Sequence, residues 1–297
     1  MRARYIVPAF AAAAALLLTG CVDNSTPAAD TPTESGSAIG ADAAAVALLP
    51  ENIKSAGVLI IGTDAAYPPN EFKDDAGAPI GWGIELSNGI AAKLGLKTKY
   101  QIASFDNIIP SITGGTVDIG ESSFTDNLER EKQVDFVNYY TAGILWAAPV
   151  GSNVDPDNAC GLTVAVQSNT VEDTDELPAK SAACVAAGKE KIQALPYGSQ
   201  DEATNAVVLG KADALSADSP VTLYAISKAG GKLEAAGKSF DTAPYGIAVN
   251  KDSELTKAVQ AALQSMVDDG SYAAILKTWG VTDGGLDTIT INAAANG

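Results

Sequence analysis

The arginine at position 130 is the residue whose chemistry stands out first. Arg2 and Arg4 lie at the extreme N-terminus, and every other basic residue is a lysine. A planar guanidinium donates two parallel hydrogen bonds to a carboxylate, a geometry that a lysine ammonium does not reproduce. We therefore predict that Arg130 binds a carboxylate. The alternative is a surface arginine, or an i,i+4 pair with Asp126 that stabilises by only about 0.5 kcal/mol when exposed.

The absence of histidine narrows the chemistry further. It excludes the Ser-His-Asp and Cys-His nucleophile schemes and the usual zinc sites. The formal net charge of −17 argues against nucleic acid, whose phosphates require a basic surface. The carboxylates are placed for salt bridges rather than for acid–base catalysis, which needs a tuned pKa. We expect a protein that is not an enzyme and that holds no metal and no cofactor.

Residues 1–20 are typical of an export signal. A positively charged start precedes an apolar stretch, Ile6 to Leu18, that is short for a membrane span. The stretch ends in Leu17-Leu18-Thr19-Gly20-Cys21, which resembles a bacterial lipobox in which Cys21 is lipidated. The alternatives are an ordinary signal or a single anchoring helix.

The following segment, 21–50, is rich in Ala, Ser, Thr, Pro and Gly and poor in large apolar residues. Such a composition buries too little surface to offset the entropy of ordering, so we expect a flexible tether. Together these features predict an extracytoplasmic protein held at the cell membrane by a lipid anchor alone.

Cys160 and Cys184 are the cysteines that remain after Cys21. An even pair in an exported chain predicts a disulfide, and closing this loop would stabilise the fold by roughly 3 kcal/mol. The alternative is a pair of reduced, buried thiols.

The rest of the chain alternates between short apolar runs and amphipathic stretches. Alternation of this kind predicts strands and helices in a largely parallel, doubly wound sheet. The pattern restarts after Gly151, which indicates two α/β units. The expected strands cover 58–62, 97–103, 117–120, 162–166, 192–196, 212–217 and 245–249, and the expected helices cover 84–94, 105–113, 128–133, 176–187, 200–209, 220–228, 253–268 and 271–279.

A series of motifs in register resembles the polar amino-acid-binding branch of the bacterial extracellular solute-binding proteins (family 3) of ABC transporters. The resemblance spans about residues 51 to 281 and rests on eight motifs: 62–72 (Gly-Thr-Asp-Ala-Ala-Tyr-Pro-Pro-Asn-Glu-Phe), 80–82, 104–110, 122–125, 129–130, 134–136, 217–220 and 243–248.

This resemblance implies an α/β, periplasmic-binding-protein-like fold with two doubly wound lobes joined by a two-strand hinge. Lobe 1 would comprise 51–140 plus 246–282, and lobe 2 would comprise 143–241. Residues 283–297 would form a C-terminal tail. The hinge would cross near 140–143 and 241–245, and the ligand would lie in the cleft between the lobes.

The resemblance also implies which residues bind the ligand. Arg130, with Ser123 and Thr125, would bind the carboxylate of an amino acid, and Asp218 its ammonium. Asp64 and Tyr67 would face the side chain, opposite Phe105. The full expected set is Asp64, Tyr67, Phe105, Ser122, Ser123, Thr125, Arg130, Gln167, Thr170 and Asp218.

The chain departs from the family pattern at several positions. Asn169 replaces a usual glycine, but asparagine tolerates a left-handed backbone, so we expect the loop to keep its shape. Gly83 replaces a usual acid. Asp64 together with Glu121 and Asp126 would make the pocket negative, which favours a ligand with a basic or amide side chain over glutamate.

We therefore expect the substrate-binding lipoprotein of an ABC importer, a monomer whose partners are a small amino acid and a transporter permease. Two alternatives stay open. One is a dehydratase-like enzyme on the same fold. The other is a sensor module that binds an amino acid without transporting it.

Overall fold

The computed structural model describes residues 39–294 of the chain. The expected signal peptide (1–20), Cys21 and the tether up to residue 38 therefore lie outside the described residues. No helix within 39–294 is both long and apolar enough to cross a membrane. The described strands form one continuous sheet in the order β4-β1-β5-β10-β6-β9-β7-β8, with β11 paired to β6 and a small separate β2-β3 hairpin.

The first part of the sheet is built on strand β1. It pairs in parallel with β4 and β5, and residues on its opposite faces enter different hydrophobic clusters. Leu59 and Ile61 pack beneath α3 and α8, whereas Ile60 faces the cluster of α4, so both faces of the strand are buried. We call this part lobe 1; its elements are β1 (Val58–Thr63), β4 (Lys97–Ile102), β5 (Ile119–Thr125), α3 (Trp82–Lys93), α4 (Phe105–Thr113), α8 (Leu255–Asp268), α9 (Ser271–Trp279), and the hairpin β2 (Phe72–Lys73) and β3 (Pro79–Ile80).

Strand β7 organises the second part of the sheet in the same way. It pairs in parallel with β8 and β9. Val164 and Val166 pack in the cluster of α5, and the intervening Ala165 packs in the cluster of α6. We call this part lobe 2; its elements are β7 (Thr163–Gln167), β8 (Gln193–Tyr197), β9 (Ala214–Asp218), α5 (Leu177–Ala186), α6 (Gln200–Val208) and α7 (Ser219–Lys228).

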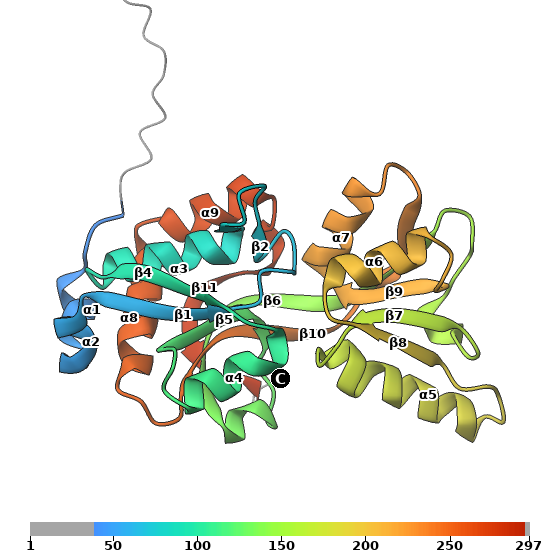
Figure 1. Cartoon of the computed structure of the whole chain (residues 1–297), viewed down its shortest axis with the longest axis horizontal. Coiled ribbons are helices and arrows are strands. Elements are labelled where there is room, and N and C mark those ends of the chain that lie inside the picture. Colours follow the sequence, from blue (N-terminus) through green and yellow to red (C-terminus); the bar gives the residue numbers. More distant parts are fainter. Residues whose placement is uncertain (1–38, 295–297) are drawn as a thin grey trace, which may run out of the picture. The chain divides into compact units, whose positions relative to one another are not determined.

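Two long antiparallel strands, β6 (Val134–Pro149) and β10 (Leu233–Asn250), connect the two parts (Figure 1). Their ladder runs regularly at either end and is interrupted between Ala236 and Ala243. Asp241 lies in this interruption with a φ of 47°, in the left-handed region. The continuous backbone of both strands thus carries the chain from one lobe to the other at a locally irregular point.

The sheet and its helices follow the predicted alternation closely. Helices α4 and α9 occupy the predicted ranges. Within the main sheet the pairing is parallel in each lobe and antiparallel where β6, β10 and β11 (Gly285–Ile291) join, and the small hairpin β2-β3 is antiparallel as well. Helices cover both faces of the sheet, as a doubly wound α/β fold requires (Figure 1). The expected helix at 128–133 is wrong, since only the short 3₁₀ turn Arg130–Lys132 forms there.

Two segments that we expected to lie outside the lobes are part of lobe 1. Ala45 of helix α1 (Ala43–Ala47), Ile53 of α2 (Glu51–Ala56) and Leu49 between the two helices are buried in its core, so the tether expected over 21–50 is wrong for residues 39–50. The tail expected over 283–297 instead contributes β11, which pairs with β6 and buries Ile289. Both segments pack against α8, a long-range contact that local composition does not reveal.

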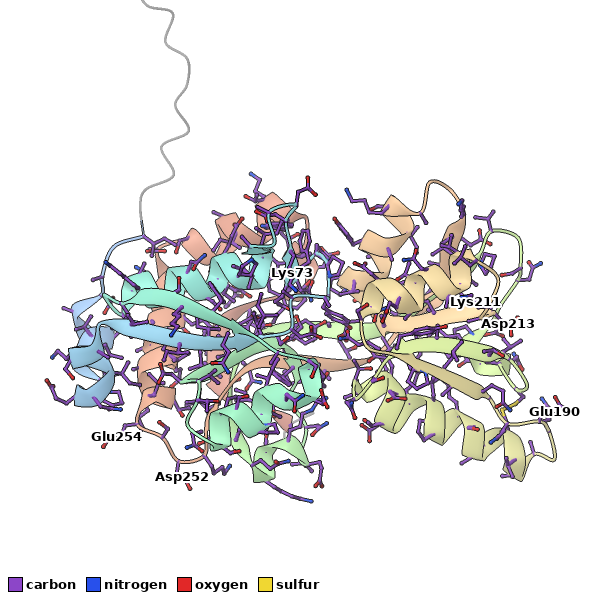
Figure 2. The ribbon with its side chains drawn as sticks, viewed as in Figure 1. Lys73, Glu190, Lys211, Asp213, Asp252 and Glu254 are labelled. Atoms are coloured by element: carbon purple, nitrogen blue, oxygen red, sulfur yellow. A yellow bond between two sulfur atoms is a disulfide. The ribbon has the colours of Figure 1, made fainter. Side chains whose placement is uncertain are left out.

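Charged side chains from both lobes point outward at the labelled positions (Figure 2). Exposed examples from both lobes are Lys73, Glu190, Lys211, Asp213, Asp252 and Glu254. Some carboxyl groups are instead buried, and their surroundings are described with the site below.

The predicted disulfide between Cys160 and Cys184 is present. Cys184 lies on α5 and packs with Leu177 and Trp146 in the hydrophobic cluster of lobe 2. The bond therefore ties α5 to the segment that enters β7.

Replacing both cysteines with serine should lower the free energy of unfolding by about 3 kcal/mol, because the crosslink restricts the unfolded chain. Urea unfolding measures this loss. Ligand affinity should not change, since neither cysteine lines the cleft described below. A large loss of affinity with little loss of stability would contradict this assignment.

Candidate ligand-binding site

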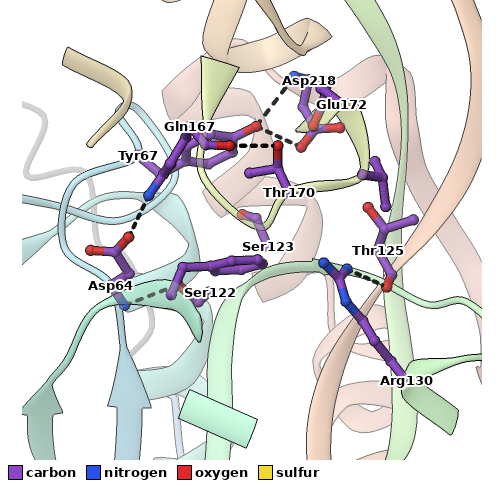
Figure 3. A pocket seen from close by; sticks show the side chains of 12 residues that line it. Asp64, Tyr67, Ser122, Ser123, Thr125, Arg130, Gln167, Thr170, Glu172 and Asp218 are labelled. Atoms are coloured by element: carbon purple, nitrogen blue, oxygen red, sulfur yellow. Dashed lines mark hydrogen bonds between the residues drawn. The ribbon is translucent and has the colours of Figure 1, made fainter. Parts of the chain in front are cut away.

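A single pocket gathers every ligand-binding residue that the sequence predicted (Figure 3). Asp64 follows β1, Gln167 and Asp218 end β7 and β9, and the β5 residues lie beside them, so the pocket forms at the carboxyl ends of the parallel strands. Open α/β sheets place ligand sites at these ends. The pocket is lined by Asp64, Tyr67, Phe105, Ser122, Ser123, Thr125, Arg130, Gln167, Thr170, Val171, Glu172 and Asp218.

Arg130 is held by neutral groups. Its backbone N–H donates to the Asn127 side chain (2.8 Å), and its guanidinium donates to the backbone carbonyls of Thr125 (2.8 Å) and Asn169 (3.1 Å). The guanidinium carbon also lies 5.3 Å from the centre of the Phe105 ring, within cation–π range. Burial lowers the pKa of Arg130, but a guanidinium stays protonated in proteins.

Among residues 39–294, no carboxylate lies within salt-bridge distance of Arg130. The alternative pair with Asp126 does not form, because Asp126 accepts hydrogen bonds from Asn138 (2.8 Å) and from the backbone of Ala293 (2.7 Å). The positive charge of Arg130 is therefore oriented by the protein but not neutralised by it.

Asp218 and Tyr67 meet across the cleft. The Tyr67 hydroxyl donates to Asp218 (2.7 Å), and the Asp218 backbone N–H donates back to the same hydroxyl (3.2 Å). Asp218 immediately precedes helix α7, but its side chain makes no capping hydrogen bond to that helix. Burial raises the pKa of Asp218 to about 6.

Asp64 makes a second contact between the lobes. Gln167 of lobe 2 donates to its carboxylate (2.6 Å), and the Asp64 backbone N–H donates to the hydroxyl of Ser122 (2.9 Å). Burial raises the pKa of Asp64 to about 6 as well. Asp64 and Asp218 are only 6% and 7% exposed, so each carboxylate gains from a cation that replaces the lost water.

The loop after β7 keeps the shape that the family pattern requires. Asn169 has a φ of 65°, which confirms that asparagine adopts the left-handed conformation in place of glycine. Its carbonyl is the one that accepts from Arg130. The hydroxyl of Thr170 donates to the Gln167 carbonyl (3.0 Å), so in this conformation Thr170 shapes the loop with its proton.

Glu172 is a pocket residue that the sequence analysis missed. It is 1% exposed, and neither of its carboxyl oxygens has a hydrogen-bond partner in the part of the chain that the structure describes. Burial, reinforced by the nearby Asp218, raises the pKa of Glu172 well above its usual value. The signal in the sequence is its position, because Glu172 begins the helical turn Glu172–Glu176 that follows the loop Gln167–Thr170, which was already predicted to bind the ligand.

Glu121 and Asp126 do not make the pocket negative, and that expectation is wrong. Asp126 faces Asn138 and Ala293, as described above. Glu121 lies behind the pocket and accepts from the Tyr139 hydroxyl (2.8 Å). The acids that line the cleft within residues 39–294 are instead Asp64, Glu172 and Asp218.

The aromatic residues divide between the site and the core. Phe105 lines the pocket and stacks on Phe124, with ring centres 4.6 Å apart. Trp82 is fully buried against Tyr140 (4.9 Å between ring centres) and belongs to the core of lobe 1.

The fold and the composition of this cleft agree with the comparisons. Residues 59–282 match the model of the bacterial extracellular solute-binding proteins, family 3, and the chain belongs to this family. It is 44% identical to the arginine-binding protein ArgT of Corynebacterium glutamicum over 248 residues, which is 83% of this chain and 82% of that protein.

Two solved structures extend the comparison. An ancestral arginine-binding protein bound to arginine has a TM-score of 0.69 and 32% identity, and the match covers 75% of this chain and 98% of that one. The ancestral amino acid-binding protein AncCDT-1, a precursor of cyclohexadienyl dehydratase, has a TM-score of 0.67 and 31% identity, covering 77% and 98%. The predicted periplasmic-binding-protein fold is thereby confirmed.

Arg130→Lys should weaken amino-acid binding by more than about tenfold, because a lysine lacks the planar fork that engages a carboxylate through two bonds. Isothermal titration calorimetry measures the affinity. The melting temperature of the empty protein should change little, since the guanidinium bonds only carbonyls at the cleft.

The reverse exchange in the same turn, Lys132→Arg, provides the control. Lys132 is exposed and pairs with Glu129, so its replacement should leave the affinity unchanged. An equal loss of stability and affinity in Arg130→Lys would show that Arg130 is architectural.

Proposed function

We propose that this protein is an extracytoplasmic receptor that binds a basic L-amino acid, with arginine as the first candidate, and delivers it to an ABC importer. The observation that carries this proposal is the charge balance of the cleft. Within residues 39–294 it is lined by three carboxyl groups and one guanidinium. The backbone of an amino acid needs one group of each sign, which leaves two acids for its side chain.

The geometry supports a specific orientation of the ligand. The ligand carboxylate would bind Arg130, with donors from Ser123 and Thr125, and its ammonium would bind Asp218. Asp64 would then face a cationic side chain, while Glu172, which lies beside Asp218, adds to the negative charge that the cleft can carry. The ring faces of Tyr67 and Phe105 suit a planar guanidinium, which stacks on aromatic surfaces.

A glutamate or glutamine side chain fits this arrangement less well. Glutamate would add a negative charge to a buried cleft that already contains Asp64 and Glu172. Like charges in a buried site are strongly unfavourable. Glutamine would leave both acids without a counter-charge. The identity of 44% to the arginine-binding protein ArgT of Corynebacterium glutamicum supports the same choice.

Closure of the lobes around the ligand is part of the proposal. Several hydrogen bonds already join the lobes directly, among them Gln167 to Asp64, Tyr67 to Asp218 and Arg130 to the carbonyl of Asn169. The irregular stretch of β6 and β10 around Asp241 supports a hinge, because residues there are not fixed by a regular ladder. Ligand binding would add charged contacts between two lobes that already contact each other directly.

The cellular setting is likewise proposed. Export followed by lipidation of Cys21 would hold the protein at the outer side of the cell membrane, where a monomer could meet its permease. Membership of the solute-binding family supports the partnership with an ABC transporter. A gene for a permease next to this gene would favour import over a purely sensory role.

A dehydratase-like enzyme is the second candidate, and Glu172 is the observation that favours it. Its raised pKa and lack of a hydrogen-bond partner suit a general acid. Incubation with prephenate or arogenate tests this function directly. Product formed by the wild type and lost in Glu172→Gln would support the enzyme; no product from the wild type would eliminate it.

Asp64→Asn should weaken arginine binding by more than about tenfold but glutamine binding by less than about threefold, since only arginine loses a charge-assisted hydrogen bond. Calorimetry with both ligands measures the difference. Asp75→Asn, in an exposed turn of the same lobe, is the matched control and should change neither affinity. Equal losses for the two ligands would contradict a cationic side chain at Asp64.

Arginine binding should also weaken as the pH falls through about 6, the raised pKa of Asp64 and Asp218. A protonated carboxyl group no longer pairs with a cation, so affinity is full above this pKa and drops by about tenfold per pH unit for each group that must ionise. Calorimetric titrations across this range measure the slope. A flat profile would mean that neither acid contacts a charged group of the ligand.

A further inference from the structure

A second pair of acids, Glu71 and Glu121, lies behind the cleft in lobe 1. Both side chains are fully buried. Glu71 belongs to the loop between β1 and β2, and Glu121 belongs to β5. Neither residue lines the pocket, and neither has a role in the proposed function.

Gly83 on α3 makes room for the two carboxyl groups. A Cβ atom added to this residue would overlap Oε1 of Glu71 and would lie 2.7 Å from Oε2 of Glu121. The carboxyl groups therefore occupy the same small space beside the helix backbone. A side chain at position 83 would push them out of it.

The surroundings of the pair favour its protonated form. Within the described chain, no ion pair involves Glu71 or Glu121. Burial raises the pKa of Glu121 to about 7, and burial together with Glu121 raises the pKa of Glu71 well above its usual value. Two carboxyl groups in contact share a proton because they cannot both ionise. Glu121 already accepts from the Tyr139 hydroxyl, so the shared proton is assigned to Glu71, whose carboxyl group lies against the hydroxyl oxygen of Ser123.

The ionisable groups that face the pair are acids and phenols. Asp64 faces Glu71 from the end of β1, and the hydroxyl of Tyr139 on β6 donates to Glu121. Tyr100 on β4 faces Glu121 as well. From α3 the pair is met by Gly83, and the acid of that helix turn, Glu85, is exposed. None of these facing groups is a cation, so none stabilises a second negative charge on the pair Glu71 and Glu121.

Ser123 links the pair to the ligand cleft. It lines the pocket, and its hydroxyl oxygen lies 3.0 and 3.1 Å from the two carboxyl oxygens of Glu71. Asn70 donates to the same hydroxyl (2.8 Å), and its own oxygen accepts from Trp82 (2.7 Å), which fixes Asn70 as a donor. The left-handed backbone of Ser123 (φ 51°) holds the hydroxyl in this position.

The direction of the bond between Glu71 and Ser123 decides what the serine offers to the cleft. When Glu71 carries a proton, it donates to the hydroxyl oxygen, which already accepts from Asn70. Both lone pairs are then used, and the serine proton is free to donate to a ligand carboxylate. When Glu71 is ionised, Ser123 must donate to it and presents a lone pair to the cleft instead.

We propose that Glu71 is a positioning residue that, through the proton it shares with Glu121, keeps Ser123 as a hydrogen-bond donor toward the bound amino acid. The inference rests on the proposed amino-acid-binding function. At alkaline pH this proton is lost to solvent, and the hydrogen bond between Glu71 and Ser123 changes direction. Ser123 then no longer donates to the ligand, so binding weakens. The effect is distinct from the weakening at acidic pH, which arises from Asp64 and Asp218.

The test compares two variants that each remove one carboxyl charge from the same cluster. In Glu71→Gln the amide is a permanent donor to Ser123, so affinity should lose less between about pH 7 and about pH 9 than that of the wild type, which weakens by about tenfold at the alkaline end. In Glu121→Gln the remaining Glu71 has no acidic partner, so its pKa falls and the weakening should begin at lower pH than in the wild type. Calorimetric titration with arginine measures all three profiles.

Two further measurements complete the experiment. The ligand ammonium titrates in the same way for every variant, so the difference from wild type isolates the protein. Ser123→Ala should bind weakly at every pH, and adding Glu71→Gln to it should change nothing more. Thermal unfolding of each empty variant verifies that it is folded.

The outcomes separate the two hypotheses. A wild type that binds no amino acid would refute the proposed function and this inference with it. Binding by the wild type with parallel pH profiles for Glu71→Gln and Glu121→Gln would refute only the role of Glu71. Opposite shifts of the two profiles would support it.

Discussion

The structure depends on one unbalanced charge arrangement, a buried guanidinium that the protein orients with carbonyl groups and does not neutralise. Arg130 bonds the carbonyls of Thr125 and Asn169 and lies over Phe105. Three buried acids line the same cleft without pairing with it. Burying separated charges is unfavourable unless partners are supplied. A ligand that carries both signs supplies them, so the cleft is incomplete without a zwitterion.

The sheet explains why these charges can stand close together without pairing. Each one lies at the carboxyl end of a different strand or in the turn that follows it, and β6 and β10 carry the two groups of strands on one backbone. Rigid strand ends hold Asp64 and Asp218 at fixed points, where Gln167 and Tyr67 satisfy them with neutral donors. A flexible surface would let arginine and acid collapse into a salt bridge, which would remove the binding site.

Local sequence patterns correctly predicted those parts of this arrangement that depend on neighbouring residues in the chain. Short apolar runs predicted the parallel strands, and motif position predicted the residues that the pocket brings together. Prediction from the sequence failed where the partners of a side chain come from another segment of the chain. Asp126 was assigned to the cleft because its partner Ala293 comes from a C-terminal segment expected to be a tail. Glu121 was assigned there because it directly precedes the pocket residues Ser122 and Ser123, whereas its side chain accepts from Tyr139 of β6 behind the pocket.

The two sets of buried acids show that burial alone does not determine what a carboxyl group does. Burial raises the pKa of Asp64 and of Glu121 alike. Asp64 opens onto a cleft where an incoming cation can restore its charge, whereas Glu121 meets only Glu71 and a tyrosine and must share a proton. The charge of the cleft therefore depends on which acids line it rather than on the acidity of the whole chain. Gly83, by leaving space for the second pair, allows the protein to keep two carboxyl groups that share a proton directly behind the charged groups of the cleft.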